Sequence, residues 1–166
     1  MRGEPAPAVR AARAADRDAV RELVALSYRE FAPLLAPEHF RRMSANLARV
    51  VATVPDRRLA VAELDGQLVG TVTYLAPDHP DYDHVPQDWA VIRALAVAPA
   101  ARGRGVGRAL TDECLRRARA DGARVVGLHT AEMMTAARAL YEGLGFVRER
   151  EFPHLGVRFL VYRLTL

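Results

Sequence analysis

The first third of the chain carries two helical patterns of apolar residues. One pattern consists of Val20, Leu23, Val24, Ser27 and Phe31, and the other of Phe40, Met43, Leu47, Val50 and Val51. We expect Asp16 to cap the first helix and Pro33 to stop it. Pro37 suits the first turn of the second helix, which Pro55 ends. A short strand over residues 9–12 comes before them.

The period then changes from helical to alternating. Residues 58–75 form two β-rich runs around Asp65-Gly66, which predicts an antiparallel hairpin with a type I′ turn. Residues 77–88 are polar and rich in proline, and therefore form a loop. The remaining pattern predicts a strand over 91–97, a helix that Gly122 closes, a strand over 124–130, a helix over 135–144 and strands over 146–151 and 157–164. This order, without repeats or a linker, predicts a single mixed α/β (α+β) domain over residues 1–166.

The composition of the chain argues against several classes of function. All 24 basic residues are arginine, so no lysine side chain can form a Schiff base. The net charge of +4 is spread along the chain, which argues against nucleic-acid binding. Cys114, the single cysteine, repeats in step with Leu110 and is expected in the core. No apolar run approaches the roughly 18 residues that a membrane span needs, and we expect a cytoplasmic protein without a membrane partner.

The segment from Arg102 to Ala109 carries the strongest chemical signal. It places three alternating glycines and three arginines between a strand and a helix. A helix start offers free N–H groups and a positive dipole end to phosphate, and glycine lets the backbone approach closely. A P-loop would need Lys-Ser/Thr after Gly107, and a dinucleotide fingerprint begun at Gly105 meets Leu110 where its last glycine belongs. Neither ATP nor NAD is favoured.

Two motifs resemble those of the GNAT N-acetyltransferases. Arg102-Gly103-Arg104-Gly105-Val106-Gly107, after a Leu-Ala-Val strand end, is similar to the family's R/Q-x-x-G-x-G/A pyrophosphate motif, and residues 137–146 (ARALYEGLGF) are similar to its A-x-x-L-Y-x-x-x-G-F segment. The resemblance implies a central, mostly antiparallel sheet of about seven strands with splayed fourth and fifth strands and four flanking helices. It also implies direct transfer of an acetyl group from acetyl-CoA, without a metal, to a primary amine of a small molecule or peptide.

The same resemblance assigns residues to the coenzyme. Those expected to bind it are Leu95, Ala96, Val97, Arg102, Gly103, Arg104, Gly105, Val106, Gly107, Arg108, Ala109, Met134, Ala137 and Tyr141. Tyr141 is also expected to protonate the departing thiolate. Val91 stands where many members have a basic glutamate, and Met134 where many have an asparagine. The general base is therefore open between His129 and Glu132, either of which could instead cap the helix that follows.

The acceptor is less well specified. Tyr28, Phe31 and Glu38 lie near the turn between the first two helices, which shapes the acceptor pocket in the resembled family. Asp81, Asp83 and His84 either form an acidic rim that attracts a cationic amine or simply keep a surface loop soluble. The spacing of the loop's acids and histidines is too irregular for a metal site.

Two other functions stay open at this point. A degenerate GNAT domain could sense acyl-CoA without turnover, and a basic interaction protein could bind RNA. Release of free thiol on incubation with acetyl-CoA and a panel of amines would distinguish the enzyme from the sensor. Salt-dependent retention of RNA would test the RNA-binding alternative. We expect a monomer or a homodimer.

Overall fold

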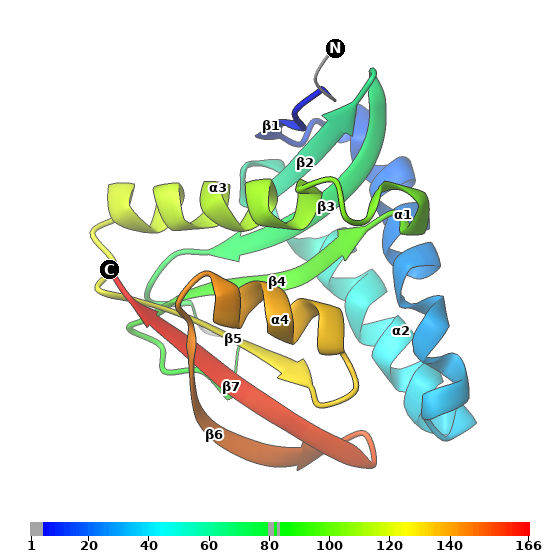
Figure 1. Cartoon of the computed structure of the whole chain (residues 1–166), viewed down its shortest axis with the longest axis vertical. Coiled ribbons are helices and arrows are strands. Elements are labelled where there is room, and N and C mark those ends of the chain that lie inside the picture. Colours follow the sequence, from blue (N-terminus) through cyan, green and yellow to red (C-terminus); the bar gives the residue numbers. More distant parts are fainter. Residues whose placement is uncertain (1–4, 80–81, 83) are drawn as a thin grey trace.

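A computed structural model describes residues 5–79, 82 and 84–166. In this part of the chain a seven-stranded sheet has the order β1-β2-β3-β4-β5-β7-β6, with α1 and α2 on one face and α3 and α4 on the other (Figure 1). The strands are β1 (Ala8–Ala11), β2 (Leu59–Leu64), β3 (Gln67–Leu75), β4 (Ala90–Val97), β5 (Val125–Ala131), β6 (Val147–His154) and β7 (Val157–Thr165). The helices are α1 (Arg17–Tyr28), α2 (Pro37–Thr53), α3 (Val106–Ala120) and α4 (Thr135–Gly143). The mixed α/β fold is confirmed.

The turn residues confirm several boundaries. Asp65 and Gly66 both have positive φ, 51° and 77°, as a type I′ hairpin between β2 and β3 requires. Gly122, with φ of 72°, follows α3 in the left-handed conformation of a helix end. The largest shift is at β6, which runs on to His154 instead of ending at residue 151.

Two expectations about α1 are wrong. The α-helix ends at Tyr28, and the chain continues as a 3₁₀ helix, η2 (Arg29–Leu34), that contains Pro33. A proline ring clashes with the carbonyl four residues earlier, so Pro33 excludes an α-helix around Arg29 but not the tighter 3₁₀ path. Asp16 occupies the N-cap position of α1 as expected, but its side chain makes no capping bond, because its carboxylate accepts hydrogen bonds from the Arg10 side chain and the Arg13 amide.

The sheet opens between β4 and β5. These strands run parallel, yet they pair only at Ala90 with Val126 and at Val91 with Gly127, whereas β5 pairs with β7 along its whole length. Beyond residue 127 the two strands diverge, which confirms the expected splay. Gly127 marks the last paired position, and a Cβ there would lie 2.6 Å from the Trp89 ring. Trp89, just before β4, is therefore packed against β5 where the gap begins.

A β-bulge bends β4 at the gap. Thr73 pairs with Arg93 and Thr71 with Ala96, so β4 has one residue more than β3 over this stretch, and Ala94 has a φ of 52°. The bulge reverses the alternation of side chains. Ile92 packs in the core under α3, and after the bulge Leu95 packs there as well, while Ala96 joins the core under α1. The bulge thus turns the end of β4 away from β5.

The core fills both faces of the sheet. Cys114 lies in the core cluster under α3 and is fully buried, as expected, and burial raises the pKa of its thiol to about 12. This thiol is therefore not a nucleophile at neutral pH. Among the described residues, no helix is long and apolar enough to cross a membrane.

Candidate active site

The glycine-rich segment forms an open loop at the start of α3. A 3₁₀ turn, η4 (Pro99–Ala101), leads into it, and Gly103 and Gly105 both have φ of 77°. A Cβ at either of these two glycines would meet no protein atom within 4 Å. Gly107 differs, because a Cβ there would lie 3.2 Å from the Leu140 side chain of α4. The first two glycines leave the loop surface open, and the third lets α3 and α4 pack closely.

Backbone donors gather at the same place. The first bond of the α3 ladder runs from the Ala109 amide to the Gly105 carbonyl, at 3.0 Å. The amides of Val106, Gly107 and Arg108 have no carbonyl of the helix to bond one turn earlier, as at any helix start. Together with the helix dipole, they make this end of α3 a site for an anion. The open glycines and these amides fit a pyrophosphate group.

The three arginines of the loop have different surroundings. Arg102 donates to the Glu30 carboxylate at 2.7 Å and to the Ser27 carbonyl at 3.2 Å, so it is held against the end of α1. Arg104 lies 4.0 Å from Asp65, and Arg108 lies 3.8 Å from Asp112 with two thirds of its side chain exposed. These two longer pairs are weak surface contacts, which leaves both guanidinium groups able to turn toward a phosphate.

The end of β4 is bonded to α1 through its carbonyl groups. The Tyr28 hydroxyl donates to the Leu95 carbonyl at 2.8 Å, and the Ser27 hydroxyl donates to the Val97 carbonyl at 3.1 Å. Burial raises the pKa of Tyr28 to about 12, so its hydroxyl keeps the proton that it donates. Each carbonyl oxygen has a second lone pair, and both groups can still accept a bond from a ligand in the gap.

Tyr141 lies on the opposite face of the sheet, in the core under α3 and α4. It is 5% exposed, its ring is edge-on to Phe146 at 5.6 Å, and burial raises its pKa well above the ordinary value. The nearby Tyr28 and Tyr82 hydroxyls raise that pKa further. Tyr141 is protonated at any working pH.

The other two residues expected on α4 lie at its start. Met134 is the residue before the helix, and its sulfur accepts a hydrogen bond from the Thr130 hydroxyl at 3.3 Å. Ala137 is half-buried against the core under α3 and α4. A methionine that is already bonded to β5 cannot donate to a ligand as an asparagine would.

The two candidate bases are not brought together. The His129 ring stacks on Tyr82 at 4.7 Å, and burial, followed by the charge of Arg93, lowers its pKa to about 3. It is therefore neutral at pH 7, and no described residue bonds its buried Nδ1 atom. Glu132 accepts a hydrogen bond from Arg158 at 2.9 Å, which lowers the pKa of its carboxyl group.

The expected acceptor residues fall into two groups. The rings of Tyr28 and Phe31 lie 6.0 Å apart in the core under α2, whereas Glu38 is exposed on the first turn of α2. His84 stacks on Phe152 of β6 at 3.7 Å and is edge-on to His129 at 6.0 Å. The expectations for Asp81 and Asp83 concern positions outside the described residues. The structure thus brings His84 and His129 together, and leaves Glu38 apart.

The comparisons with known proteins agree with this geometry. A family model described as the acetyltransferase (GNAT) family matches residues 17–146. The chain belongs to the GNAT family. Mycothiol acetyltransferase from Cellulomonas flavigena is 38% identical over 117 residues, which cover 68% of this chain and 33% of that protein. Its counterpart from Geodermatophilus obscurus is 44% identical over 70 residues, which cover 42% of this chain and 23% of that protein. The chain therefore spans about a quarter to a third of the length of these curated relatives.

Solved structures share the GNAT fold over nearly the whole chain. A GCN5-related N-acetyltransferase from Kribbella flavida is 29% identical with a TM-score of 0.68, covering 97% of this chain and 98% of that chain. PaiA N-acetyltransferase from Thermoplasma acidophilum, solved in complex with coenzyme A, is 13% identical with a TM-score of 0.76, covering 98% and 100%. At 13% identity, the similarity to PaiA N-acetyltransferase shows only that the two proteins share a fold.

Two residues of the candidate site were missed from the sequence. Tyr82 is buried beside His129, and Arg93 lies over the Tyr82 ring at 4.6 Å. Each of these residues departs from the composition of its surroundings, and that departure was visible in the sequence. Tyr82 is an aromatic residue in a loop of prolines and acids, and Arg93 is a charge inside an apolar strand.

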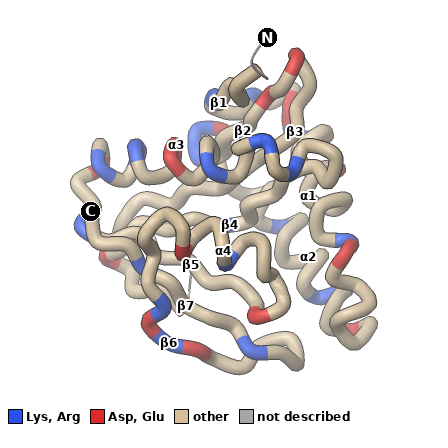
Figure 2. Tube along the Cα trace, in the orientation of Figure 1, with Lys and Arg blue, Asp and Glu red and all other residues tan. Residues whose placement is uncertain are grey.

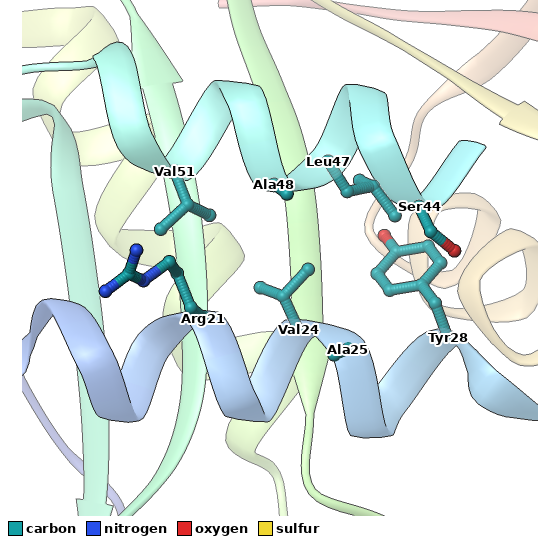
Figure 3. Close-up of a pocket in the computed structure, with 8 residues that line it drawn as sticks. All are labelled: Arg21, Val24, Ala25, Tyr28, Ser44, Leu47, Ala48 and Val51. Carbon is teal, nitrogen blue, oxygen red and sulfur yellow. The ribbon is translucent and has the colours of Figure 1, made fainter. Parts of the chain in front are cut away.

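A small apolar pocket lies outside the gap, between α1 and α2 (Figure 3). Its volume is about 50 Å³, and it is lined by Arg21, Val24, Ala25, Tyr28, Ser44, Leu47, Ala48 and Val51. Tyr28 forms one end of it and carries the hydroxyl that bonds Leu95. This tyrosine thus separates the pocket from the end of β4.

Charge is mixed over the surface. Figure 2 shows basic and acidic residues interspersed along α3 and along β6, and Glu113 of α3 lies 2.8 Å from both Arg116 and Arg117. In the part of the chain that the structure describes, no three His, Cys, Asp or Glu side chains are grouped to hold a metal ion.

Proposed function

We propose that the chain is an N-acetyltransferase that moves an acetyl group from acetyl-CoA directly to a primary amine of a small molecule or peptide. The observation that carries the proposal is the open glycine loop at the start of α3, next to the gap between β4 and β5. The loop offers amides to a pyrophosphate, and the gap offers the carbonyls of Leu95 and Val97 to the coenzyme's pantetheine arm.

Each part of the site has a role in this proposal. Bound acetyl-CoA supplies the thioester that the amine attacks. The amides of residues 106–108 hold its phosphates, and Arg104 and Arg108 add charge at the rim. Tyr141 keeps its phenol proton at neutral pH because of burial, and in this proposal it gives that proton to the leaving thiolate.

The acceptor amine must lose a proton before or during attack. His129 is the better placed of the two candidate bases, because it is neutral and packs beside Tyr82 near the gap, whereas Glu132 is paired with Arg158. A pKa of about 3 makes this imidazole a weak base. We therefore expect the enzyme to prefer amines that are already partly deprotonated at the assay pH.

The acceptor itself is the least defined part. Relatives named mycothiol acetyltransferase favour a small-molecule amine, and Tyr28, Phe31 and His84 are the described residues that we assign to its pocket. An acidic contribution from Asp81 and Asp83 stays a prediction, as does a cytoplasmic monomer or homodimer.

The test combines binding with turnover. Acetyl-CoA should raise the melting temperature more than ATP or NADH does, because a ligand that binds only the folded state stabilises it. Incubation with acetyl-CoA and a panel of polyamines, aminoglycosides, amino acids and peptides should then release free thiol. A shift without thiol release on any amine would favour the acyl-CoA sensor, an alternative that Val91 and Met134 motivate. An equal shift with all three nucleotides would reject the coenzyme site.

A further inference from the structure

Arg102 connects the coenzyme loop to the end of α1. Its guanidinium donates to Glu30, 72 positions earlier, and to the carbonyl of Ser27, 75 positions earlier. The hydroxyls of Ser27 and Tyr28 bond the two carbonyls at the end of β4. The last turn of α1 is thus tied both to the loop that would hold the phosphates and to the strand that would hold the pantetheine arm.

The bond between Arg102 and Glu30 is the weak member of this set. Both side chains are well exposed, 36% for Arg102 and 48% for Glu30, and an exposed ion pair contributes little to stability. A phosphate offers the same guanidinium two parallel charge-assisted bonds and a larger charge. Arg102 directly precedes Gly103 of the open loop, so a phosphate bound there competes with Glu30 for it.

We propose that coenzyme phosphate displaces Glu30 from Arg102, and that this exchange frees Glu30 and the start of η2 from the coenzyme loop, while the bonds of Ser27 and Tyr28 to β4 remain. This inference rests on the proposed function, since it takes the glycine loop as the phosphate site. Glu30 lies in η2, the segment that also carries Phe31 and directly follows Tyr28. Glu30 is therefore a positioning residue, which couples occupancy of the donor site to the residues assigned to the acceptor. Such coupling is reciprocal, so an acceptor that contacts this segment changes coenzyme affinity by the same factor.

The experiment measures coenzyme A affinity by titration calorimetry at low ionic strength. Glu30→Gln removes the competitor for Arg102, and the variant should bind coenzyme A about two- to fivefold more tightly, the factor that corresponds to an exposed ion pair. Glu22→Gln removes the same charge from an exposed position of α1 and should bind as the wild type does. Arg102→Gln should bind more weakly than either.

A double variant distinguishes the exchange of partners at Arg102 from a purely structural role of Glu30. In the Arg102→Gln background, Glu30→Gln should no longer change the affinity, because the group that it released is gone. If Glu30→Gln binds no more tightly than Glu22→Gln, or if its effect persists without Arg102, the exchange is wrong while the coenzyme site stands. If the wild type does not bind coenzyme A at all, the proposed function fails instead. Glu30→Ala gives a second variant with the same expected gain.

Discussion

The regions that we assign to the donor and to the acceptor of this GNAT domain are built in different ways. The donor side uses two short stretches of sequence, residues 95–109 and 134–146, and most of its groups are backbone amides, carbonyls and glycines. The proposed acceptor side collects Tyr28 of α1, Phe31 of η2 and His84 of the loop before β4. His84 in turn packs against His129 of β5 and Phe152 of β6. A site made of backbone needs particular residues at fixed spacing, and that spacing can be recognised in one sequence. A site made of distant side chains has no such spacing.

The largest effect is expected from a substitution that disrupts only the proposed coenzyme site. Gly105→Val should weaken acetyl-CoA binding at least about 100-fold, because the new side chain stands where the pyrophosphate must approach and removes about two charge-assisted bonds. Gly66→Val is the matched control. Its glycine also has φ of 77°, and a Cβ added there would meet nothing within 4 Å, so the backbone strain is comparable while the coenzyme loop is untouched. Calorimetry that finds equal affinity in both variants would place the phosphate site elsewhere.

The next prediction concerns Tyr141, the residue that we propose as the acid for the leaving thiolate. Tyr141→Phe should lower kcat at least about tenfold, because it removes the phenol proton and keeps the buried ring. The affinity for acetyl-CoA and the melting temperature should change little. Tyr162→Phe serves as the control, since that hydroxyl bonds Glu142 at 2.6 Å and should affect stability more than kcat. Wild-type kcat in folded Tyr141→Phe, with an acceptor for which chemistry limits the rate, would leave Tyr141 a packing residue.

The last prediction probes the proposed acceptor side through the pH dependence of stability. The pKa of His129 is lowered in the folded state, so the unfolded chain binds the extra proton and the stabilising contribution is lost as the pH falls below about 6.5. The loss is at most about 1.4 kcal/mol per pH unit, and it continues toward the folded pKa of about 3. His129→Phe keeps the stack on Tyr82 without a titrating group. Its free energy of unfolding should therefore fall less steeply than that of the wild type between about pH 6.5 and 4.5, and parallel slopes would contradict the buried neutral imidazole.

The fold could be predicted largely because local rules determine it. Asp65-Gly66 allows one kind of tight turn, Gly122 one kind of helix end, and Pro37 a helix start, and each behaves as these rules require. Pro33 was misjudged, because the rule that proline breaks an α-helix says nothing of the 3₁₀ helix that replaces it. Asp16 was misjudged for another reason, since Arg10 offered its carboxylate a stronger partner than the helix amides did.

The contacts of the site were harder to predict. The glycine loop was evident, but no pattern in the sequence indicates that Arg102 is bonded to Glu30 or that Tyr28 is bonded to Leu95, partners 72 and 67 positions apart. The bulge at Ala94 was also missed, because alanine in the left-handed conformation has no compositional mark. These features depend on how α1 packs against β4, which a single sequence does not specify.

The short pairing of β4 with β5 has a mechanical consequence. Only two residue pairs join strands β1 to β4 with strands β5 to β7, so the described sheet is two ladders that meet at a narrow junction. Beyond that junction the halves are held together by side-chain packing, in which Ile92 of one half and Leu128 of the other belong to the same cluster. Packed side chains permit small sliding and rotation that a ladder of backbone bonds resists. The junction at residues 90–91 and 126–127 is therefore the narrowest backbone connection within the described sheet, and it adjoins the gap in which the reaction is proposed to take place.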